Sequence, residues 1–91
     1  MNLENILAQY DAMFGKNSLN EIEEYLVEMI TEAKNKAEWG ILVTLLNEII
    51  GFCRDTTQKE KALQYCDEFL FFYQRIPRLH PKYKLYQYPM L

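Results

Sequence analysis

The chain has 91 residues, enough for one domain but near the lower limit for a core that forms without disulfides or a metal ion. Hydrophobic residues make up 49% and charged residues 25%, a globular composition that excludes a disordered chain. Three Gly and three Pro are too few for the many tight turns of an all-β protein, so the composition favours helices.

The net charge of −3 is unevenly distributed along the chain. Residues 1–33 carry one Lys against seven acids, whereas residues 75–91 carry four cations and no acid. The first residues have neither the positive nor the apolar region of a secretory signal, and the apolar stretch 41–52 is too short to span a bilayer. We therefore expect a cytoplasmic location without membrane contact.

Apolar residues at three- and four-residue steps predict a first amphipathic helix over residues 3–14, ended by Gly15. Ser18 and Glu21 have the spacing of a capping box, which predicts that a second helix starts there. The two apolar stripes comprise Leu3, Ile6, Leu7, Tyr10, Met13 and Phe14 in the first helix, and Ile22, Tyr25, Leu26, Met29, Ile30 and Ala33 in the second.

Asn35 with Glu38, and Thr57 with Glu60, repeat this start signal and predict a third and a fourth helix. The third is apolar on most sides, as expected of a central helix. Connections of a few residues make successive helices antiparallel neighbours. The predicted apolar positions are Trp39, Leu42, Leu45, Leu46, Ile49, Phe52 and Cys53 in the third helix, and Ala62, Leu63, Tyr65, Cys66, Phe69, Leu70, Phe72 and Tyr73 in the fourth.

The helical pattern ends near Arg75, because Pro77 and Pro81 each remove a backbone donor. Residues 75–91 are therefore predicted to be an irregular or extended basic tail that follows a helical domain over residues 1–74. Cys53 and Cys66 match no zinc or redox spacing, so we expect two buried free thiols.

An internal repeat relates the second helix to the fourth. A shift of 40 residues lays residues 21–30 over 61–70 and aligns Tyr25 with Tyr65 and Glu28 with Glu68. Such self-similarity is typical of helical solenoids. Residues 46–70 combine an apolar helix, a short turn and a second helix with the small Ala62 where the two helices pack closest.

This combination resembles a tetratricopeptide repeat, well over residues 39–73 and loosely over residues 4–34. The departures are Ile50 and Thr57, where the family prefers small residues, and a spacing longer than the family's roughly 34 residues. The resemblance implies an all-α fold of two antiparallel hairpins, at about residues 3–34 and 36–74, stacked as a right-handed solenoid. Similar bacterial proteins carry more repeats, so the chain is expected to be the start of an array, stopped early by an unrelated tail.

In such repeats, first-helix residues that do not pack line a concave surface for an extended peptide. Thr44, Asn47, Gly51 and Arg54 share one stripe of the third helix and are the candidate partner-binding residues. Their polar groups need partners, supplied either by a ligand or by internal or inter-subunit hydrogen bonds. The family's carboxylate clamp is not matched, because Asn47 and Gly51 stand where it would place Lys and Asn.

Other classes of function have weaker support. Glu48 and His80 could be an acid and a base, but no nucleophile pattern or phosphate loop accompanies them, so we expect no enzyme, catalytic residue or cofactor. The glutamates of residues 21–32 are interpreted as a solvated helix face rather than a metal site. Basic and aromatic residues alternate over residues 82–88, but four cations on an acidic chain disfavour nucleic-acid binding.

Two hypotheses remain. The chain is either a non-enzymatic interaction module that holds a peptide or helix of another protein in a groove between helix pairs, or a self-associating structural protein. Solenoid repeats are usually stable only in groups of about three, which favours a homodimer for a chain with two. The run of residues 69–73, which is apolar on more than one helix face, also favours a homodimer.

Overall fold

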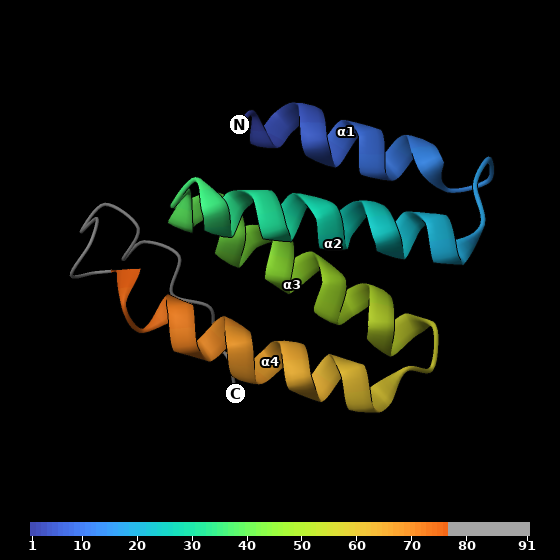
Figure 1. Ribbon diagram of the computed structural model, residues 1–91. Helices are drawn as coiled ribbons and strands as arrows, with labels where there is room; N and C mark the ends of the chain where they lie inside the picture. The colour runs from blue at the N-terminus through green and yellow to red at the C-terminus, as the bar shows by residue number, and fades with distance from the viewer. Residues whose placement is uncertain (77–91) are drawn as a thin grey trace.

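The computed structural model describes residues 1–76, and over this range the protein is all-helical, as predicted (Figure 1). The predicted tail from residue 77 onward lies outside the described residues. Four helices follow one another, with boundaries within about three residues of the predicted ones: α1 (Leu3–Met13), α2 (Leu19–Asn35), α3 (Trp39–Asp55) and α4 (Lys59–Tyr73).

Successive helices run antiparallel, so that α2 and α4 point in the same direction (Figure 1). Their side chains meet near both ends. The Lys61 ammonium lies 2.7 Å from a Glu23 carboxylate oxygen, and the Lys34 ammonium lies 2.8 Å from a Glu68 oxygen. Ion pairs therefore link α2 and α4 near both ends, while each of the two helices packs its backbone against α3.

Helices α1 and α3 are related in the same way. The amino group of Met1 lies 3.3 Å from a Glu38 carboxylate oxygen just before α3, and the rings of Phe14 and Phe52 lie 6.4 Å apart at the opposite ends of the two helices. The two hairpins thus have the same orientation and lie side by side.

The first two helices have side-chain caps. The side-chain oxygen of Asn2, Oδ1, accepts from the Asn5 backbone amide at 3.0 Å at the start of α1. The predicted capping box of α2 is confirmed, since the Ser18 hydroxyl accepts from the Glu21 amide at 3.1 Å while the Glu21 carboxylate accepts from the Ser18 amide at 2.9 Å. Both caps satisfy backbone donors that the helix itself leaves free.

The predicted start signals of the third and fourth helices are wrong. Asn35 is the last residue of α2 rather than a cap of α3, and Thr57 precedes the true N-cap of α4. Glu38 and Gln58 are the N-cap residues, and neither makes a side-chain capping bond. The spacing of capping residues did not locate the starts of α3 and α4, because a different hydrogen-bonded turn stands before each of these helices.

That motif is the same three-residue turn at both places. Ala37 and Thr57 have left-handed backbones, with φ of 56° and 61°. In each turn the next amide donates to a carbonyl five residues back, which is the Schellman pattern that ends a helix. These bonds run from the Glu38 amide to the Ala33 oxygen at 2.9 Å and from the Gln58 amide to the Cys53 oxygen at 2.7 Å.

The predicted 40-residue repeat holds for the second helices of the hairpins, because α2 begins at Leu19 and α4 at Lys59. It does not hold for the first helices, which begin 36 residues apart, at Leu3 and Trp39. The difference arises because α3 has 17 residues and α1 only 11, while the connection after α3 is two residues shorter.

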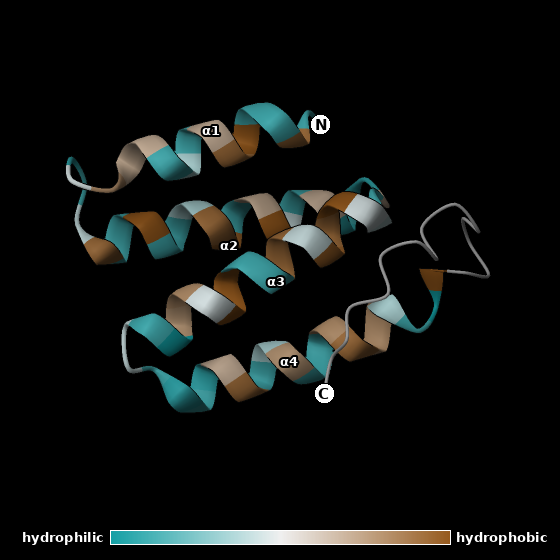
Figure 2. Cartoon of the chain, turned by 180° about the vertical axis from the view of Figure 1, so that it is seen from behind, coloured by the Kyte–Doolittle hydropathy of each residue, from teal (hydrophilic) through white to brown (hydrophobic). Residues whose placement is uncertain are grey.

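Helix α3 is the centre of the core, as its apolar pattern predicts. It supplies seven of the 17 buried hydrophobic residues within residues 1–76, whereas α4 supplies only two. Hydrophobic positions occur along all four helices (Figure 2). The predicted core residues Leu63 and Phe14 are instead 56% and 46% exposed, and of the two thiols only Cys53 is buried, Cys66 being partly covered.

Within residues 1–76, no helix combines the length and the apolar character needed to cross a bilayer.

The left-handed turns generate a stability prediction. A β-branched residue at φ 61° is strained, and glycine adopts that backbone without a clash. We expect Thr57→Gly to raise the free energy of unfolding by about 1 kcal/mol, measured by urea denaturation. Gly15→Ala, at φ 85°, should have the opposite effect. A lower stability for Thr57→Gly would contradict the assigned turn.

Candidate functional site

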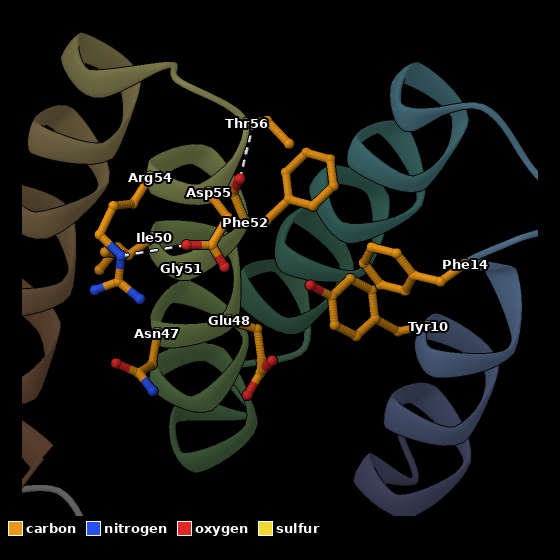
Figure 3. A pocket seen from close by; sticks show the side chains of 10 residues that line it. All are labelled: Tyr10, Phe14, Asn47, Glu48, Ile50, Gly51, Phe52, Arg54, Asp55 and Thr56. Atoms are coloured by element: carbon orange, nitrogen blue, oxygen red, sulfur yellow. Dashed lines mark hydrogen bonds and ion pairs between the residues drawn. The ribbon is translucent and has the colours of Figure 1, made fainter.

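A hollow of about 500 Å³ lies on the face of α3 that points away from the core, with α1 along one side (Figure 3). We call it the α1–α3 hollow. Its wall combines aromatic rings from α1 and α3 with polar and charged side chains from the second half of α3. The lining residues are Tyr10, Phe14, Asn47, Glu48, Ile50, Gly51, Phe52, Arg54, Asp55 and Thr56.

Three of the four candidate binding residues, Asn47, Gly51 and Arg54, line this hollow. They lie on successive turns of α3, as the helical spacing requires. Thr44 does not line the hollow, and its hydroxyl donates to the Gly40 carbonyl of the same helix at 3.0 Å. Thr44 therefore has the internal hydrogen bond that was the alternative interpretation for this stripe.

Gly51 makes room for the hollow. A methyl group added at its Cα would meet only the Arg54 guanidinium, at 3.8 Å. Glycine inside a helix is about 1 kcal/mol less favourable than alanine, so this position lowers the stability of α3 without any packing need for a small residue. The space above Gly51 is open to a ligand.

Tyr10 reaches across from α1 to the hollow. Only 7% of its surface is exposed, and its ring meets that of Phe14 edge-on at 5.2 Å. Figure 3 shows its hydroxyl directed toward α3, and within residues 1–76 this hydroxyl makes no hydrogen bond. Within residues 1–76, every fully buried side-chain oxygen has a hydrogen-bond partner. Since the Tyr10 oxygen has none, it is not fully buried and meets solvent in the hollow.

The electrostatics of the hollow are acidic. Burial, followed by the carboxylates of Glu48, Asp11 and Asp55, raises the pKa of Tyr10 to about 12. Burial and then the charge of Asp11 raise the pKa of Glu48 above its usual range. Both shifts mean that additional negative charge is unfavourable there. The carboxylates supply the smaller part of both shifts, and a cation bound beside them would offset that part.

The one cation of the hollow's lining only partly balances this charge. Arg54 lies 3.6 Å from Asp55, and both side chains are more than 70% exposed, at 73% and 76%. Such an exposed pair is weak. Glu48 forms no ion pair with any residue in the range 1–76.

A second hollow, of about 550 Å³, lies between α2 and the start of α4 and contains Glu23, Glu24, Glu28 and Lys61. Its chemistry is different, because Glu23 accepts hydrogen bonds from Lys61 at 2.7 Å and from Gln58 at 3.2 Å. The Lys61 bond is the main reason that the pKa of Glu23 is lowered. Its most buried charge is thus already neutralised, which makes the α1–α3 hollow the better candidate site.

Sequence reasoning missed Tyr10, Phe14 and Asp55 as parts of this site. Both aromatic residues were assigned to the apolar stripe of the first helix, and Glu48 was considered only as an acid catalyst. The sequence signal for this site was Gly51 one helical turn after Glu48 in an otherwise apolar helix. That signal cannot locate the opposite wall, which forms only when α1 packs against α3.

No family model, curated protein or solved structure matches this chain. The resemblance to tetratricopeptide repeats therefore rests on the residue pattern and stays a prediction.

The pKa of Tyr10 generates a prediction. A folded-state pKa of about 12, above the unfolded value near 10, stabilises the fold below pH 10, and this contribution is lost as the pH rises through 12. We expect the wild-type protein to lose on the order of 2 kcal/mol more stability than Tyr10→Phe between pH 9.5 and 12, measured by urea unfolding. Parallel losses in the two proteins would place the Tyr10 hydroxyl in open solvent.

Proposed function

We propose that this protein is a non-enzymatic, tetratricopeptide-like interaction module that binds a peptide or helix of another protein in the α1–α3 hollow. The observation that carries the proposal is the hollow itself, where aromatic rings from the α1 side, the Glu48 carboxylate without an ion pair and the side-chain-free Gly51 line one space. The Tyr10 hydroxyl meets solvent there and has no protein partner within residues 1–76, so a bound peptide would replace water at this oxygen.

The pairing of like helices supports this proposal. In stacked hairpins, the first helices lie side by side and present a common face, and here α1 and α3 do so. Glu48 and Gly51 on α3 line the hollow together with the aromatic pair Tyr10 and Phe14 from the α1 side. A wall of helices that combines aromatic rings with polar side chains is suited to hold a peptide or a helix.

A second candidate function, self-association, is favoured by the outer surface of α4. Leu63 and Phe71 are 56% and 50% exposed there. Leu63 also borders a mostly apolar groove of about 390 Å³ with Ile50, Ala62 and Cys66. Exposed apolar patches of this kind occur at protein interfaces. This groove adjoins the α1–α3 hollow, because Ile50 and Arg54 line both, so the two functions are distinguished at Leu63 and Gly51, each of which lines only one of them.

The test is capture of partners by the full-length tagged chain, compared with two substitutions at one position. Gly51→Leu fills the hollow, and we expect it to abolish partner recovery without loss of fold, because leucine favours the helix more than glycine does. Gly51→Ala adds one methyl group and should keep most of the recovery. Asn47→Ala and Arg54→Ala should reduce it.

Leu63→Ser is the matched control in the neighbouring groove, at a residue that does not line the α1–α3 hollow. It should leave partner recovery unchanged but reduce recovery of a second copy of the chain that carries a different tag. Loss of partners with Leu63→Ser and full recovery with Gly51→Leu would overturn the proposed site and favour α4 as the interface.

A further inference from the structure

The α1–α3 hollow contains two hydrogen-bond acceptors without a protein donor within residues 1–76, beside the donors of Asn47 and Arg54. Glu48 is partly buried and has no ion pair within residues 1–76, and the Tyr10 hydroxyl oxygen is also without a donor. Asp11 adds a third negative group close enough to raise the pKa values of both. A ligand with several N–H donors and a positive charge would satisfy these groups together.

The aromatic wall of the hollow narrows the choice of cation. Phe14 is 46% exposed, and it packs edge-on against Tyr10 at 5.2 Å and tilted against Phe52 at 6.4 Å. Both contacts hold its ring at the rim of the hollow and leave part of its surface open. A planar guanidinium stacks on such a ring and also donates in a fixed fork to a carboxylate, whereas an ammonium does neither as well.

Two other hollows within residues 1–76 lack the combination of an unpaired carboxylate and an aromatic ring. In the hollow between α2 and α4, Lys61 is already paired with Glu23, and the groove beside Leu63 is lined by the cations Arg54 and Lys59 besides its apolar residues. Within residues 1–76, the α1–α3 hollow combines a partly buried carboxylate without an ion pair, Glu48, with a partly exposed aromatic ring, Phe14. Its lining cation, Arg54, lies beside Gly51 and is paired with Asp55 rather than with Glu48.

We propose that the α1–α3 hollow binds an arginine side chain of an extended partner segment. The guanidinium donates to the Glu48 carboxylate and to the Tyr10 hydroxyl and stacks on the ring of Phe14, while the segment's backbone runs over Gly51. This inference rests on the proposed function and adds to it the chemistry of the partner. The selective element is the unpaired carboxylate, which would repel an acidic peptide.

The experiment is a titration of the full-length ¹⁵N-labelled chain with N-acetyl-arginine N-methylamide, followed by amide chemical shifts. We expect the largest shifts at Asn47, Glu48 and Gly51. N-acetyl-citrulline N-methylamide, which has nearly the same shape without the charge, should bind at least about tenfold more weakly. The lysine analogue should fall between the two.

Substitutions on the same scaffold assign the contacts. Glu48→Gln should weaken arginine binding about tenfold and reduce its preference over citrulline. Glu28→Gln, which removes the same charge from an exposed position on α2, should leave binding unchanged. Tyr10→Phe keeps the ring and should weaken binding by a smaller factor.

Each remaining outcome is informative. Equal binding of arginine and citrulline at Gly51 would overturn the arginine assignment but leave the hollow as a binding site. Shifts spread over the glutamates of α2, or equal losses from Glu28→Gln and Glu48→Gln, would show nonspecific attraction and overturn it as well. If Arg78→Gln alone moved the Gly51 and Glu48 signals without a ligand, the chain's own basic tail would be the occupant instead of a partner.

Discussion

The burial of helix α3 is the constraint on which the rest of this structure depends. Its buried residues lie on more than one side, since Leu42, Leu45, Leu46, Ile49 and Cys53 are all fully covered. An amphipathic helix needs one neighbouring surface, but α3 needs several. Helices α2 and α4 provide most of the cover, and α1 adds Ile6, Tyr10 and Met13 at the side.

The same constraint defines the site. With most of its circumference buried, α3 has one strip left for solvent, and this strip carries Asn47, Glu48 and Gly51. The aromatic side chains of α1 reach only to the edge of this strip. A position that lacks a side chain, beside a partly buried carboxylate, lowers stability in a small domain that has little to spare. Such a cost is typical of surfaces selected for binding.

The helices could be predicted from the sequence because apolar spacing and the Ser18 capping box are local signals. The boundaries before α3 and α4 could not, because their turns depend on left-handed backbones at Ala37 and Thr57, residues without a preference for that conformation. For the site, the spacing of Asn47, Gly51 and Arg54 was sufficient to find one wall. Tyr10 and Phe14 form the other wall through long-range packing, which no local pattern reports.

The central burial of α3 is tested most directly by native-state amide hydrogen exchange on the full-length chain. We expect the slowest exchange across Leu42–Cys53, with α1 exchanging faster because only three of its residues are buried. Exchange in α3 as fast as that in α1 would contradict the central position of this helix, and with it the geometry of the α1–α3 hollow.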